Sequence, residues 1–118
     1  MLPNPNSQRG IELQQAHVGL VMRVLGMDEE DVIRAFEPVV ATGTHSRAPA
    51  IVAYRDRVFW ALSEARVNGV GLTAVEIALV TGVPSHSTVV MGCRRARAAK
   101  ALTPEQITAL RNGGRNDE

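Results

Sequence analysis

The chain has 118 residues, enough for one domain with a buried core and too few for two domains of ordinary size. Hydrophobic residues make up 45% but aromatic residues only 3%, so we expect a core of Val, Leu, Ile and Ala in closely packed helices. The formal net charge of +1 excludes a strongly basic tail, and the single cysteine excludes an internal disulfide.

The N-terminal part of the chain is predicted to be an arm followed by two helices. Residues 1–9 are rich in Pro, Asn, Ser and Gln and are expected to form a flexible arm. Within residues 10–45, apolar spacings of three and four predict a helix from Gly10 to Leu25, and Asp28 is a good N-cap for a second helix. A loop is expected at 41–46. We interpret this helical pair as a candidate for self-association.

The second segment, residues 46–111, begins with the longest predicted helix. A wide apolar stripe predicts this helix from Pro49 to Val67, and the run from Asn68 to Gly71 ends it. Thr73 and Glu76 then have the spacing of a capping box, which is a specific signal for the start of the next helix.

Further start and stop signals divide the rest of the chain. Gly82 can adopt the left-handed conformation that stops a helix, and Ser85 is placed to start another one that runs to about Ala101. The run from Thr103 to Gln106 is a further capped start, and residues 112–118 are expected to be disordered. The chain is therefore predicted to form a compact all-α domain of about five to six helices.

The two helices on either side of Gly82 have the composition of a helix-turn-helix, over roughly Thr73 to Lys100. Ala78 is small enough for close helix approach, and Val83 can fill the corner between the helices. The second helix is expected to bury Val89, Val90 and Cys93. Its outer surface is expected to carry Ser87, Thr88, Met91, Arg94 and Arg95. One face would then hold the helix on the domain, and the other would be free to enter the major groove of DNA.

The charges along this segment are unevenly distributed. No acid occurs between Val83 and Leu102, whereas acids gather between Asp28 and Glu37. The predicted DNA phosphate contacts are Ser85, Arg94, Arg95, Arg97 and Lys100. A run of basic residues also occurs on ordinary solvent-exposed helix faces, so the positive charge by itself does not establish DNA binding.

Four short stretches follow one another in the order and spacing of a known motif. They are Thr73–Ala78, Gly82, His86–Val90 and Cys93–Arg95. With their surroundings, roughly residues 54–98, they resemble the C-terminal DNA-binding domain of the bacterial replication initiator DnaA. The resemblance implies that His86, Ser87 and Thr88 read bases in the major groove, and that Arg55 or Arg57 enters the minor groove. Pro84 and Ser85 stand where that family usually has a basic residue and an aspartate, which indicates a different target sequence.

The leading hypothesis is a sequence-specific double-stranded DNA-binding protein, a small transcriptional regulator of the phage or mobile-element type. It would act as a homodimer or higher homo-oligomer, associated with the nucleoid. The 118 residues contain no phosphate-binding loop and leave no room for an ATPase domain, so we do not expect a replication initiator. Two alternatives stay open: a DNA-packaging or replication accessory subunit that forms a ring or filament, and a protein-binding adaptor on a degenerate helix-turn-helix.

No enzymatic activity, cofactor or metal site is expected. His17 and His45 have no companions at metal-ligand spacing, and Cys93 is expected to pack in the core. Ser85 and His86 are adjacent, but a catalytic triad also needs an orienting acid and an oxyanion hole. No apolar stretch reaches the roughly 18 residues needed to span a bilayer, so we expect a cytoplasmic protein without a membrane partner.

Overall fold

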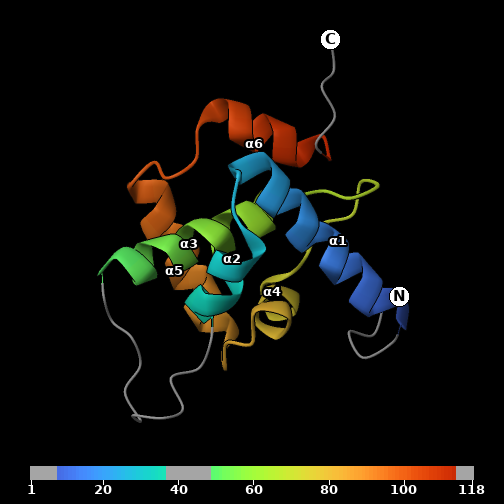
Figure 1. The fold of residues 1–118 in the computed structure, drawn as a ribbon, viewed down its shortest axis with the longest axis horizontal. Coiled ribbons are helices and arrows are strands. Elements are labelled where there is room, and N and C mark those ends of the chain that lie inside the picture. The colour runs from blue at the N-terminus through green and yellow to red at the C-terminus, as the bar shows by residue number, and fades with distance from the viewer. Residues whose placement is uncertain (1–7, 37–48, 114–118) are drawn as a thin grey trace.

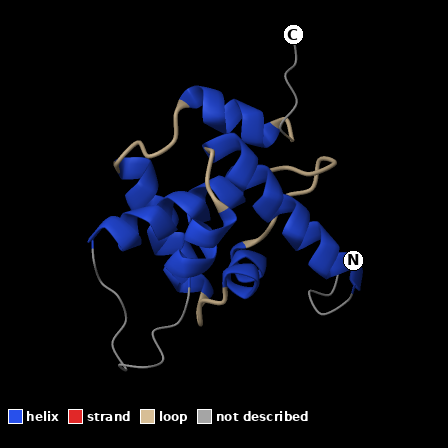
Figure 2. Cartoon of the chain, viewed as in Figure 1, coloured by secondary structure: helices blue, strands red, loops and turns tan. Residues whose placement is uncertain are grey.

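The computed structural model describes residues 8–36 and 49–113. The predicted loop at 41–46, with His45, and most of the predicted arm and tail lie outside the described residues. The prediction that the arm reaches residue 9 is wrong, because α1 begins at Gln8. The helices are α1 (Gln8–Leu25), α2 (Glu29–Phe36), α3 (Pro49–Glu64), α4 (Ala74–Thr81), α5 (His86–Ala98) and α6 (Pro104–Arg111). Figure 2 shows helices and loops but no strand in the described part, which confirms the predicted all-α fold of five to six helices.

The helix starts follow from local capping, as the sequence predicted. Thr73 Oγ1 accepts a hydrogen bond from the Glu76 amide at 3.2 Å, and Glu76 Oε1 accepts one from the Thr73 amide at 2.9 Å. Thr103 and Gln106 form the same reciprocal pair at the start of α6. Each box satisfies two amide groups that the first helical turn leaves unpaired. The capping-box predictions for α4 and α6 are therefore confirmed.

The core is built around α3, which contacts each of the other five described helices. Phe59 and Leu62 of α3 are almost completely buried, together with Leu20 and Val21 of α1. Trp60 of α3 is also buried, at 7% exposure. Because α1 contributes to the same core cluster as α3, the N-terminal helices share the core of the C-terminal segment. In Figure 1, α6 lies at the top of the described part of the chain, and α4 lies in its lower part.

The chain between α3 and α4 makes a tight two-residue turn. Helix α3 ends at Glu64, three residues before its predicted end. Asn68 and Gly69 have φ of +53° and +77°, and Val67 and Val70 exchange two backbone hydrogen bonds of 3.0 Å across them. An Asn-Gly pair favours this hairpin geometry because both residues tolerate positive φ. The chain therefore forms this turn instead of extending α3. The sequence indicated only that the helix breaks here, and not that a hairpin turn forms.

The turn is attached to α1 through a buried histidine. His17 is 0% exposed, and its Nε2 and Nδ1 atoms each lie 2.7 Å from a carbonyl oxygen, that of Val70 and that of Leu13. The ring nitrogen that carries the proton donates to one of these carbonyl oxygens, so the burial of this polar ring is compensated. His17 therefore has a structural role at the junction of α1 with the turn.

Helices α4 and α5 meet at a sharp bend, with an angle of 100° between them. In the described part of the chain, no single helix is long and apolar enough to cross a membrane. Taken together, α4 and α5 pass such a test of length and composition, but they do so as a strongly bent pair.

Candidate nucleic-acid interface

The bend between α4 and α5 is fixed by the residues that connect them. Gly82 has a φ of +77°, a left-handed conformation that costs glycine little, and its amide donates to the carbonyl of Ala78. The Val83 amide bonds the same carbonyl at 3.1 Å, and the Val83 side chain packs partly buried against the core. Ser85 then caps α5, because its Oγ accepts a hydrogen bond from the Ser87 amide at 3.1 Å. The predicted stop at Gly82 and start at Ser85 are both confirmed.

Helix α5 divides sharply into a buried face and an exposed face. The buried residues Val89, Gly92, Cys93 and Ala96 repeat at spacings of three, one and three, which places them on one stripe of the helix. The exposed residues are His86, Ser87, Thr88, Val90, Met91, Arg94, Arg95, Arg97 and Ala98. The prediction that Val90 is buried is wrong: α5 packs against Phe59 and Asp56 of α3 at Gly92, and Val90 is 37% exposed.

The close approach of α5 to α3 depends on Gly92. A Cβ atom at this position would lie 2.6 Å from Cδ2 of Phe59 and 2.8 Å from Oδ1 of Asp56. Real Cβ atoms do not come so close to their neighbours, so a side chain here would force α3 and α5 apart. Gly92 therefore sets the depth at which α5 docks and the position of its exposed face.

The basic residues of the candidate site fall into two groups. Arg94, Arg97 and Lys100 are exposed and have no ion-pair partner within the described residues. Arg95 instead donates from Nε and Nη2 to both carboxylate oxygens of Asp56, at 2.8 and 3.0 Å. Asp56 is 5% exposed, and these hydrogen bonds raise the pKa of Arg95 above its ordinary range. Arg95 thus neutralises a buried carboxylate, while the other three keep their charge for an external partner.

The two arginines proposed for the minor groove both hold other parts of this chain. The Nε of Arg55 donates to the carbonyl oxygen of Ala35 at the end of α2, and its guanidinium lies 5.8 Å from the ring centre of Phe36. The Nε of Arg57 donates to the carbonyl oxygen of Ala101 at 3.1 Å. Arg55 therefore attaches α2 to α3, and Arg57 attaches the turn after α5 to α3.

Cys93 lies on the buried face of α5, as predicted. Burial raises the pKa of its thiol, an effect that a hydrogen bond with the Ser63 side chain partly opposes. A thiol with a raised pKa is a poor nucleophile at neutral pH. Within the described residues, no three His, Cys, Asp or Glu side chains are grouped so that they could hold a metal ion.

The chain resembles no known protein closely enough for a role of the site to be transferred to it. No protein-family model matches the chain. Searches of curated proteins and of solved structures likewise find no match.

Proposed function

We propose that the chain binds double-stranded DNA, with α4 and α5 acting as a helix-turn-helix and α5 as the helix that enters the major groove. The observation that carries this proposal is the joint geometry of the two helices. A helix-turn-helix joins two helices at about 90–120° by a turn of three or four residues. Here the angle is 100°, and the residues from Gly82 to Ser85 make the connection.

The exposed surface of α5 has the composition that groove entry needs. Its first turn carries His86, Ser87 and Thr88, whose short polar side chains can reach base edges while the helix approaches the groove closely. Its formal charges are all positive, because α5 contains no Asp or Glu. Arg94 and Arg97 are free of ion pairs within the described residues and can bind phosphates.

Two exposed apolar side chains refine the expected target. Val90 and Met91 are 37% and 48% exposed, one turn after Ser87 and one turn before Arg94 on the same side of the helix. Apolar side chains in the major groove commonly contact the C5-methyl group of thymine. We therefore expect target sites to contain A·T pairs at the positions that face this part of α5.

As a regulator, the protein would use two copies to span two half-sites on DNA. Sedimentation of the protein bound to a selected site is expected to give a mass with two copies. A larger closed assembly would instead favour the packaging or replication accessory role.

A salt titration tests the proposal directly. Affinity for random-sequence duplex, measured by fluorescence anisotropy, is expected to fall linearly in a plot of log affinity against log salt. Replacing Arg94 by Gln removes one phosphate contact and is expected to reduce the magnitude of the slope by about 1. Arg34→Gln is the matched control, since Arg34 is an exposed arginine on α2 and its loss changes the net charge equally.

Two results would refute the proposal. One is the absence of binding at low salt by a protein whose circular dichroism shows it to be folded. The other is an equal loss of affinity in Arg94→Gln and Arg34→Gln, which would indicate that net charge, and not the α5 surface, attracts DNA.

A further inference from the structure

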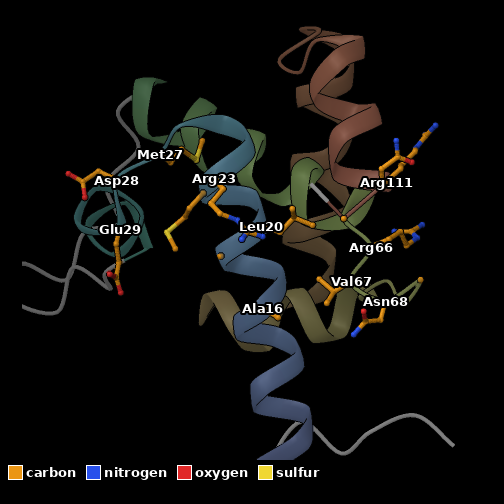
Figure 3. A pocket seen from close by; sticks show the side chains of 15 residues that line it. Ala16, Leu20, Arg23, Met27, Asp28, Glu29, Arg66, Val67, Asn68 and Arg111 are labelled. Carbon is orange, nitrogen blue, oxygen red and sulfur yellow. The ribbon is translucent and has the colours of Figure 1, made fainter. Parts of the chain in front are cut away.

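A large cleft lies away from α4 and α5, between α1 and the C-terminal end of α6. Its volume is about 980 Å³, at the upper end of the range of small-molecule sites, which is about 300–1,000 Å³. The residues that line it come from α1, the start of α2, the turn after α3 and the end of α6 (Figure 3). Since no residue of α4 or α5 lines the cleft, it is separate from the proposed DNA-binding surface.

The best-fixed charged group in this cleft is Arg66. Its Nη1 atom donates to the carbonyl oxygens of Ser63, Glu64 and Ala65 at 3.0, 3.2 and 2.9 Å, at the end of α3. Its guanidinium also lies over Gly71, where a Cβ atom would come within 2.8 Å of Nη1. Nε and Nη2 have no hydrogen-bond partner within the described residues. Arg66 is thus held rigidly by one nitrogen and keeps donors for another group.

Two further arginines line the same cleft. Arg111 uses Nη2 to bond both carboxylate oxygens of Glu64 at 3.2 Å, which leaves its Nε and Nη1 without a partner in the described part of the chain. Arg23 of α1 is exposed and has no partner there at all. Glu64 compensates one of the two positive charges of Arg66 and Arg111, so one net positive charge is left at their end of the cleft.

The other charges of the cleft lie apart from this pair. Figure 3 shows Arg66 and Arg111 at one end of the cleft, and Asp28 and Glu29 at the other end, beyond Arg23. The acids are therefore not placed to neutralise Arg66 or Arg111. The cleft has a cationic end that can take an anionic group and an acidic end that would repel a second one.

From this arrangement, we propose that the cleft binds a small ligand through a carboxylate or phosphate group held by Arg66 and Arg111, with Arg23 farther along the cleft toward its acidic end. The planar guanidinium fork matches both anions, because each offers two oxygens to parallel N–H donors. Arg66 is already ordered by its bonds to α3, so binding loses little side-chain entropy at this residue. The proposal does not depend on DNA binding, since the two surfaces share no residue.

A titration of the full chain with simple anions tests this proposal. Amide resonances are followed in ¹H–¹⁵N spectra as inorganic phosphate or, separately, acetate is added at constant ionic strength. We expect saturable shifts at Asn68, Gly69, Asn112 and Gly113, which line the cleft. The anion that gives the tighter binding identifies the ligand group as a phosphate or a carboxylate.

Variants show whether the arginines are responsible. Arg111→Gln is expected to weaken anion binding by about tenfold, the usual effect of losing a charged hydrogen bond, and Arg23→Gln, farther along the cleft, is expected to weaken it less. Arg97→Gln, an exposed α5 substitution with the same charge change, is expected to leave it unchanged. Arg66 is not substituted, because its loss would also leave the end of α3 uncapped.

The proposal is overturned if neither anion shifts the cleft amides in a saturable way. It is equally overturned if Arg97→Gln weakens binding as much as Arg111→Gln, because binding would then follow net charge. Saturable shifts confined to the amides of α5 would also contradict it, while supporting an anion-binding surface on that helix.

Discussion

Alanine at Gly92 is expected to destabilise the protein, although alanine favours helices more than glycine does. The added Cβ would lie within 2.8 Å of both the Phe59 ring and the Asp56 carboxylate. Neither neighbour can easily move, since Phe59 is 1% exposed and Asp56 is held by two hydrogen bonds to Arg95. The substitution therefore has to separate α3 from α5 or displace one of these groups.

The magnitude follows from two opposing contributions. Overpacking a well-packed core costs about 1–3 kcal/mol, and two contacts below 3.0 Å place Gly92 in the upper part of this range. The helix propensity of alanine returns about 1 kcal/mol. The free energy of unfolding is therefore expected to fall by about 1–2 kcal/mol, and Tm by about 5–10 °C.

Gly19 provides the matched control, because it is a helical glycine with space around it. A Cβ at Gly19 would have no heavy atom within 4 Å outside its own helix. Gly19→Ala is thus expected to raise stability by about 0.5–1 kcal/mol through helix propensity and the lower entropy of the unfolded chain. Both variants are compared by urea denaturation followed by far-UV circular dichroism. Stability of Gly92→Ala equal to or above that of the wild type, with Gly19→Ala stabilised, would refute the close contact of α3 and α5.

Three further predictions concern the chain just after the C-terminal end of α5 and the inner face of this helix. Lys100 has a φ of +52°, a left-handed conformation that is strained for lysine but not for glycine. Lys100→Gly is therefore expected to raise the free energy of unfolding in urea by about 1 kcal/mol and to weaken DNA binding. A lower free energy of unfolding would contradict this backbone strain. Burial raises the pKa of Cys93, so alkylation by iodoacetamide at pH 8 is expected to be about tenfold slower or more than in the urea-unfolded chain. Because the folded pKa is the higher one, this thiol contributes stability below its ordinary pKa of 9.0 and loses that contribution as pH rises through the folded pKa. The urea midpoint of the wild type should therefore decline more steeply above pH 9 than that of Cys93→Ala, and parallel declines would contradict the shift.

The sequence predicted the helix boundaries best where a signal is local. Thr73 and Glu76 are three residues apart, and their capping box needs nothing beyond one helical turn. The stop at Gly82 and the cap at Ser85 likewise depend only on neighbouring residues. So does the cap at Asp28, where Oδ1 of Asp28 accepts a hydrogen bond from the Glu30 amide at 3.3 Å. Where a signal was ambiguous, as at the Asn68–Gly69 turn, the end of the helix was placed three residues too late.

The orientation of α5 was predicted in outline but not in detail. Periodicity placed Val89 and Cys93 on the inner face, and both are buried. It also placed Val90 there, although Val90 is 37% exposed. The periodicity of apolar residues in a helix does not define how wide the buried stripe is. That width depends on how closely the partner helix approaches. Gly92 decides that approach, and its role could not be known before Phe59 and Asp56 were located on α3.

For the described part of the chain, the sequence by itself determined an all-α fold of about five to six helices, the caps that begin α2, α4, α5 and α6, and a basic, acid-free segment around α5. The tertiary structure decided which charges are free, because ion pairs join residues far apart in the chain. Arg94 and Arg95 are adjacent and identical in the sequence. Only Arg95 forms an ion pair with Asp56, which lies 39 residues before it in the chain. The cleft has the same origin, since Arg23, Arg66 and Arg111 come to line one cleft only when α1 and α6 pack beside the end of α3. Local hydrogen bonding can be predicted from adjacent residues, whereas the compensation of charge depends on distances that folding creates.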